Sequence, residues 1–169
     1  MEQKDAANNE AQGAHHKGNP FLTDIDADIM SDVYRYQLWH LSARIDDLKI
    51  KHPGYAYRDE LKQASKALAL AIHDTRFHYD QQHFDEWEKL IAETKQLLKK
   101  VMVQLKYRSH FAEVICYTSI EDGGFLYYGE VIGTDDLITF GGKTLEEAEQ
   151  DFHDAIDEFL DEKNVNSGY

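Results

Sequence analysis

Histidine and aspartate recur along one stretch of the chain, and both residue types can bind transition metals. The stretch contains His73, Asp74, His78, Asp80, His83 and Asp85. Imidazole and carboxylate groups are ordinary ligands of Zn²⁺. On one continuous helix, however, steps of five residues turn successive side chains by roughly 140°, so the three histidines cannot face a single ion. The sequence therefore predicts surface and turn histidines here, and we expect neither a metal site nor a cofactor.

Two arginine–histidine pairs have a spacing that is found in some ribonucleases. Arg35 with His40 and Arg76 with His83 resemble the short Arg-x₄₋₆-His signature of HEPN ribonucleases, which are helical proteins. A chain with nine histidines is expected to contain such pairs by chance. No Gly-rich phosphate loop, Ser-His-Asp order or Cys-His pair is present. We therefore expect a non-enzymatic protein without catalytic residues.

Acidic residues dominate the charge of the chain, and they are unevenly placed. The formal net charge is -14, with 32 acidic and 18 basic residues among 169. Residues 108–169 contain 15 of the acidic residues but only 3 of the basic ones. A chain of this charge repels the phosphate backbone, so direct binding to nucleic acid is not expected. The asymmetry suggests two parts with different roles.

Three helices are predicted in the first two thirds of the chain. Apolar residues recur in steps of three and four from about residue 23 to Pro53, from about Arg58 to Tyr79, and from about Phe84 to Leu105. The apolar face shifts between the second and third segments, which predicts a turn near residues 80–83. We expect a three-helix bundle over residues 23–107, which could also join copies of the chain into a homo-oligomer.

The last third of the chain has the pattern of a small sheet with a helix. Alternating residues predict strands over 111–118, 125–131 and 137–140, with turns at 121–124 and 133–136. Thr144 and Glu147 then form a capping box at the start of an amphipathic helix. The predicted fold class is α+β: an N-terminal three-helix bundle, then a three-stranded antiparallel sheet packed on one C-terminal helix. A disordered leader (1–22) is expected before the bundle. The sheet and helix occupy residues 108–162, and a disordered tail (163–169) follows them.

The compartment is indicated only by features that the sequence lacks. A lone cysteine, Cys116, cannot form an internal disulfide, which favours a reducing environment. No apolar run is long enough to span a membrane, and the first residues lack the apolar core of a signal peptide. We expect a cytoplasmic protein that does not bind membranes.

The segment from Tyr117 to Leu160 resembles the core of HicB-like antitoxins. It reads YTSIEDGGFLYYGEVIGTDDLITFGGKTLEEAEQDFHDAIDEFL. The resemblance lies in Gly123, Phe125, Gly129, Val131, Gly133, Asp136, Leu137, Thr139, Phe140, Gly142, Glu146, Glu147, Phe152, Asp157 and Leu160. It implies a partial ribonuclease H-like fold that lacks the catalytic carboxylates. It also implies a partner, because members of the family bind and mask a small basic ribonuclease toxin.

We therefore expect the acidic third of the chain to bind a basic protein. The candidate partner-binding residues are Glu121, Asp122, Tyr128, Glu130, Asp135, Asp136, Asp151, Asp154 and Glu158. The alternative is a phage-type mimic of nucleic acid that inhibits a nucleic-acid-handling complex. Two simpler interpretations stay open: the acidic helix face is only solvated, or it is neutralised within the chain by Lys95, Lys99, Lys106 or Arg108.

Overall fold

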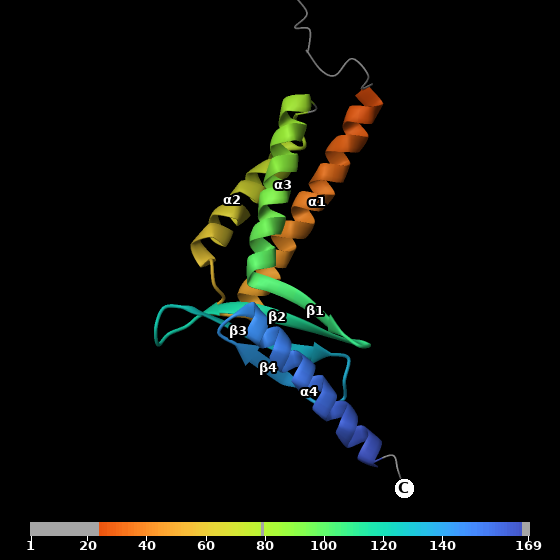
Figure 1. The fold of residues 1–169 in the computed structure, drawn as a ribbon. Helices are drawn as coiled ribbons and strands as arrows, with labels where there is room; N and C mark the ends of the chain where they lie inside the picture. Colours follow the sequence, from red (N-terminus) through yellow and green to blue (C-terminus); the bar gives the residue numbers. More distant parts are fainter. Residues whose placement is uncertain (1–23, 79, 167–169) are drawn as a thin grey trace, which may run out of the picture.

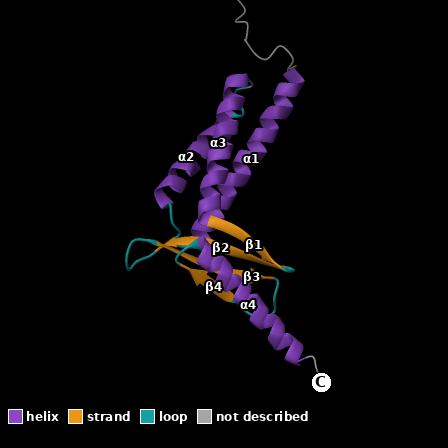
Figure 2. Cartoon of the chain, viewed as in Figure 1, coloured by secondary structure: helices purple, strands orange, loops and turns teal. Residues whose placement is uncertain are grey.

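The computed structural model describes residues 24–78 and 80–166. Three helices come first: α1 (Asp24–Lys51), α2 (Arg58–Asp74) and α3 (Gln81–Val101). Four strands follow, β1 (Met102–Tyr107), β2 (His110–Thr118), β3 (Phe125–Ile132) and β4 (Thr139–Gly142), and then a last helix, α4 (Leu145–Asn166) (Figures 1 and 2). The predicted leader and residues 167–169 of the predicted tail lie outside the described residues. Residues 163–166, which were also predicted as disordered tail, instead belong to the end of α4.

The three N-terminal helices pack around one apolar core. On α1 the predicted stripe Leu38, Leu41, Ile45 and Leu48 is buried. It meets buried side chains of the other two helices: Leu61, Leu68, Ala71, Phe84, Trp87, Ile91, Leu98 and Val101. Spacings of three and four residues put these side chains on one face of each helix, and burial of those faces stabilises helices that would be marginal alone.

Thr75 ends α2 and fixes that end to α1. The Ser31 hydroxyl donates to the Thr75 carbonyl at 2.6 Å, and Arg35 Nη2 donates to the same oxygen at 2.9 Å. Arg35 Nε also donates to Thr75 Oγ1 at 2.9 Å. The last carbonyl groups of a helix have no partner within the helix, so these bonds supply one. Arg35 therefore has a structural role. Helix α2 ends at Asp74, several residues before the turn predicted near residues 80–83.

The third helix ends earlier than its apolar spacing predicts. The prediction of a helix to Leu105 and of a three-stranded sheet is wrong, because α3 stops at Val101 and residues 102–107 form β1. β1 pairs with β2 from Met102↔Ile115 to Tyr107↔His110. Val101 and Leu105 fit a helical step of four, but Leu105 also alternates with Val103 and Tyr107 as a strand requires. Hydrogen bonding to β2 selects the strand over the helix for residues 102–107.

The four strands form an antiparallel meander in the order β1-β2-β3-β4. The three predicted strands correspond to β2, β3 and β4. The Phe140 ring of β4 lies across Gly129 of β3, where an added Cβ would be 2.4 Å from the ring. Glycine is therefore required at 129 by close packing. At the start of α4, Thr144 Oγ1 accepts the Glu147 N–H at 3.1 Å, as the capping box predicts.

Three connections place the bundle against the sheet. α3 continues directly into β1, so the two elements share a backbone. The loop between α1 and α2 lies along the end of β2, where Ala56 N–H donates to the Cys116 carbonyl at 2.8 Å. Ile115 of β2 also belongs to the core of the bundle. In Figure 1 the lower ends of α1 and α3 accordingly reach the sheet, and the lower end of α2 continues into the loop that lies along it.

Candidate partner-binding surface

The two faces of the sheet are covered differently. α4 covers one face, where Phe152 and Ile156 are completely buried against Val114, Val131 and Phe140. The helix bundle lies on the opposite face but reaches only the end that contains Met102, Ile115 and Tyr117. No described element covers the remainder of that second face, which is called the open face below.

Carboxylates and apolar side chains share this open face. Glu113 of β2 is directly opposite Glu130 of β3, and Phe111 is directly opposite Ile132. Phe111 is 52% exposed and Ile132 is 55% exposed. Among the described residues, neither carboxylate has a hydrogen bond or ion pair. Like charges directly opposite each other in an antiparallel pair are destabilising, so this arrangement has a cost in the isolated chain.

A groove of about 680 Å³ lies over this face. Glu113, Tyr128, Glu130 and Ile132 line it from the sheet, the loop of residues 133–137 forms another wall, and His52 and Tyr117 lie at the bundle side. His52 Nδ1 and the Tyr117 hydroxyl are 3.0 Å apart and share a hydrogen bond. Burial, and then the neighbouring Tyr128, raise the pKa of Tyr117 above its ordinary value. The phenol is therefore neutral and fixed in place.

Four of the predicted partner-binding residues come together in this groove. Tyr128 and Glu130 lie on β3, and Asp135 and Asp136 lie on the adjoining loop. Tyr128 and Glu130 are both exposed, because alternation along β3 turns them away from α4 while Val131 points toward it. The groove thus combines acidic groups with an aromatic ring.

The predicted residues on α4 lie on the other side of the sheet. Asp151 Oδ2 accepts the Gly141 N–H at 2.9 Å and so connects the helix to β4. Asp154 accepts a hydrogen bond from Gln150 of the same helix at 2.9 Å. Glu158 and Asp136 line a second hollow, of about 630 Å³, between α4 and the loop. Asp136 therefore borders both hollows, whereas Asp151 has a structural position.

Glu121 and Asp122 lie in the β2–β3 turn, apart from the groove residues. Asp122 Oδ1 accepts the Gly124 N–H at 3.0 Å. Hydrogen bonds from Ser119 and then from the Gly124 backbone lower the pKa of Asp122. This carboxylate thus stabilises the turn, and Glu121 is exposed beside it.

Basic residues of the same chain neutralise only a small part of the acidic region. Arg108 forms an ion pair with Asp157 of α4 at 2.9 Å, and Lys163 forms one with Asp136 at 3.9 Å. Lys106 lies over the Phe111 ring on the open face. Within the described residues, Lys95 and Lys99 of α3 form no ion pair with an acidic group. Arg108 therefore neutralises part of the acidic helix α4 from within the chain, whereas Lys95 and Lys99 of α3 do not.

Glu113, His52 and Tyr117 also line this surface, although they are not among the predicted partner-binding residues. A signal for Glu113 was present: Thr118 pairs with Phe125 across the predicted turn, and counting back along both strands places 113 opposite 130. No comparable signal exists for His52. It approaches Tyr117 only because the bundle lies on that end of the sheet.

Comparison with known proteins gives no match. No protein-family model matches the sequence, and no curated protein or solved structure is significantly similar to it. None of the helices in residues 24–78 and 80–166 is both long and apolar enough to cross a bilayer.

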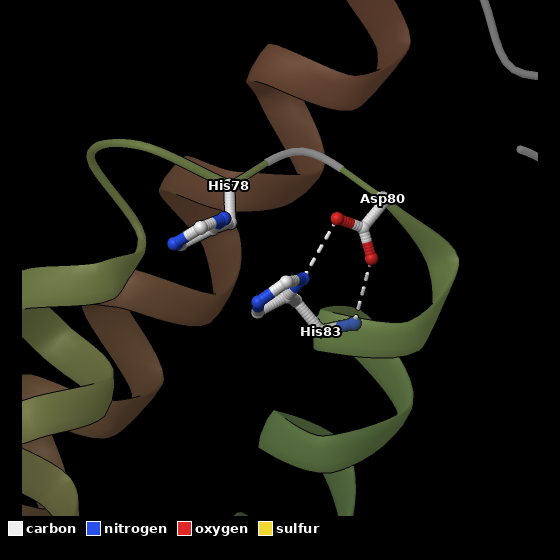
Figure 3. Close-up of side chains that lie close together, drawn as sticks. All are labelled: His78, Asp80 and His83. Carbon is white, nitrogen blue, oxygen red and sulfur yellow. Dashed lines mark hydrogen bonds and ion pairs between the residues drawn. The ribbon is translucent and has the colours of Figure 1, made fainter. Parts of the chain in front are cut away.

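A group of metal-binding residue types lies far from this surface, in the turn between α2 and α3. One ligand atom from each of His78, Asp80 and His83 lies within 4.8 Å of the others. His83 Nδ1 and Asp80 Oδ2 are 2.7 Å apart, and the ring of His78 is stacked on that of His83 (Figure 3). It is the one such group of three that the described residues contain.

Proposed function

We propose that this protein is a non-enzymatic binding protein whose acidic groove covers a cationic surface of a basic protein partner. The observation that carries the proposal is the opposed pair Glu113 and Glu130, which forms no hydrogen bond or ion pair among the described residues. Lys51, which is ion-paired with Asp47, interacts with Glu113 only at longer range. A lysine or arginine from another protein, placed between the two carboxylates, would remove their repulsion and form charge-assisted hydrogen bonds to both.

The surroundings of the pair support a protein partner. Phe111, Tyr128 and Ile132 are large, exposed apolar side chains on the same open face. Aromatic anchors beside charged groups are typical of protein interfaces, in which burial supplies affinity and charge supplies specificity and a fast association rate. Asp135 and Asp136 extend the negative charge along the groove.

The resemblance of residues 117–160 to HicB-like antitoxins suggests which kind of partner to test first. In that family the partner is a small basic ribonuclease. We propose the same logic here: the acidic surface occupies the face that would otherwise bind RNA phosphate, and the ribonuclease is inhibited by competition. Such a role would place the protein in the cytoplasm, where the buried thiol of Cys116 stays reduced.

Affinity capture from the native host, at low and at high salt, tests this proposal. Recovery of one small basic protein at low salt, with loss at high salt, is the expected result. Recovery of a large nucleic-acid-handling complex would instead favour the alternative function, in which the protein mimics nucleic acid. Recovery of no protein at either salt concentration would contradict the proposal and leave a solvated acidic surface.

Charge-reversal variants locate the contact. Glu113→Lys with Glu130→Lys should abolish capture, and the matched pair Glu86→Lys with Glu93→Lys on the exposed side of α3 should not. Asp154→Lys with Glu158→Lys tests the face of α4. If that pair abolishes capture and the groove pair does not, the contact is the helix and the groove assignment is wrong.

The helical region has a second apolar surface, which supports self-association. Ile29, Val33, Tyr36 and Trp39 recur at helical spacing along α1, and Tyr36 and Trp39 are at least 60% exposed. The opposite side of the same helix already faces the core of the bundle. A helix that is apolar on both sides normally packs on both sides. The proposal therefore includes a homo-oligomer formed through α1.

A further inference from the structure

The turn between α2 and α3 brings together residues that a continuous helix would keep apart. α2 ends at Asp74 and α3 begins at Gln81, so His78 and His83 are not on the same helix. Their rings are stacked, with centroids 4.1 Å apart and planes 9° apart. The reason for expecting no metal site was the 140° rotation between histidines on one helix, and that rotation does not apply across the turn.

The two carboxylate oxygens of Asp80 contact different nitrogens of His83. Oδ1 accepts the backbone N–H of His83 at 3.1 Å and caps α3, while Oδ2 lies 2.7 Å from His83 Nδ1 (Figure 3). Capping therefore occupies only one of the two carboxylate oxygens.

We infer that His78, Asp80 and His83 form a binding site for a divalent first-row transition metal such as Zn²⁺. Two imidazoles and one carboxylate are a donor set that these ions prefer, whereas Mg²⁺ and Ca²⁺ prefer oxygen donors alone. The ion takes the place of the hydrogen between Asp80 Oδ2 and His83 Nδ1. A neutral His83 then carries its single proton on Nε2, and a protonated His83 releases one proton to solvent.

The distances are close to those of such a site. Ligand atoms bonded to Zn²⁺ at about 2.1 Å are at most about 4.2 Å apart. The Asp80 and His83 atoms meet this limit, and the ligand atoms of all three residues lie within 4.8 Å. Because a metal lies in the plane of an imidazole that binds it, the His78 ring must leave its stack on His83 to turn a nitrogen toward the ion. Asp80 and His83 are 34% and 27% exposed, so an ion can enter without unfolding the helices.

A third ligand distinguishes this arrangement from a simple helix cap. An Asp cap and its bond to His83 need no further histidine, yet a ligand atom of His78 also lies within 4.8 Å of those of Asp80 and His83. Bound metal would hold the turn after α2 to the first turn of α3, and because the unfolded chain lacks this geometry, binding would stabilise the folded state.

Calorimetric titration of the full chain with ZnCl₂ tests the site. We expect saturable binding that is lost in His78→Gln with His83→Gln and weakened at least tenfold in Asp80→Asn, which keeps the cap because asparagine also caps helices. MgCl₂ should not bind. His73→Gln, an exposed histidine close by on α2, should bind zinc as the parent does. A variant with both His15→Ser and His16→Ser measures how much zinc the sequence before α1 binds.

Tryptophan fluorescence gives a second, independent readout. The Trp87 ring lies 6.0 Å from the His83 ring, and the chain has two tryptophans. In a Trp39→Phe variant, Cu²⁺ should quench Trp87 saturably, and zinc should compete with it. If the parent binds no zinc, or if the His78→Gln, His83→Gln variant binds zinc with unchanged affinity and quenching, the inference is overturned.

Discussion

Glu113 and Glu130 lie directly opposite each other in the antiparallel register of β2 and β3, on the face of the sheet that α4 does not cover. No hydrogen bond or ion pair to either carboxylate occurs in the described part of the chain. The Asp47 hydrogen bond, and more weakly Glu113, raise the pKa of Lys51 at the end of α1. Lys51 thus offsets only part of the repulsion between the two carboxylates, and a cation placed between them would offset more of it.

Removal of one charge from this pair should stabilise the protein while weakening its binding. Glu113→Gln relieves the cross-strand repulsion, and we expect a gain of roughly 0.2–1 kcal/mol in the free energy of unfolding at low salt. Urea unfolding at low and high salt measures it, and the gain should shrink as salt screens the charges. Glu86→Gln, far from the groove, should show no such gain. A stability loss in Glu113→Gln would contradict the repulsion.

Asp151 should contribute to stability rather than to recognition. Its carboxylate accepts the Gly141 N–H of β4, so Asp151→Ala should lower the free energy of unfolding by about 1 kcal/mol. Asp154→Ala loses only a bond to Gln150 on the same helix and should be close to neutral. Thermal unfolding of the two variants compares them. Capture of the partner should persist in Asp151→Ala; its complete loss there would return Asp151 to the binding surface.

Gly129 should not tolerate a side chain. An alanine Cβ would lie 2.4 Å from the Phe140 ring, so Gly129→Ala should destabilise the protein by about 1–3 kcal/mol. Gly124→Ala is the comparison, because a Cβ there meets the movable carboxylate of Asp122 at 3.2 Å. Chemical unfolding measures both. Combining Gly129→Ala with Phe140→Leu should recover part of the loss, and no recovery would show that the clash is not with that ring.

Stability should fall in alkali because of Tyr127. Burial, and then the neighbouring Cys116, raise the pKa of Tyr127 from 10.0 to about 12. The folded state therefore holds the phenolic proton more tightly than the unfolded state does. This stabilisation is complete below pH 10 and is lost as the pH rises to 12. Unfolding measured from pH 9 to pH 12 should show a decline that is smaller in Tyr127→Phe. A decline of equal size in the variant would assign it to other groups.

Self-association should depend on the exposed side of α1. Tyr36→Lys with Trp39→Lys places two charges on the apolar stripe without touching the buried core, so the helices should remain folded. We expect sedimentation equilibrium to show an oligomer for the parent and a monomer for the variant. Lys99→Glu with Lys95→Glu on α3 is a control for the change in charge. A parent that is monomeric at high concentration would contradict this part of the proposal.

Much of the local structure could be predicted because it depends on neighbouring residues. The buried stripe of α1, the cap of α4 at Thr144 and the alternation that buries Cys116 follow from spacings of three, four and two. The candidate site was predicted in part. Tyr128, Glu130, Asp135 and Asp136 share the groove, whereas Asp151 is used to hold α4 against β4.

Only the tertiary structure decided where α3 ends, which face of the sheet stays open, and that His78 meets His83. Leu105 satisfies both a helical and a strand spacing, and pairing with β2 selects the strand. The open face depends on where the bundle lies, which follows from the contact of the α1–α2 loop with Cys116. Sequence periodicity is local, while hydrogen bonding between distant strands and the packing of helices on a sheet are not. The sequence by itself therefore determined the elements and their acidic charge, and the packing determined which of those charges share a surface.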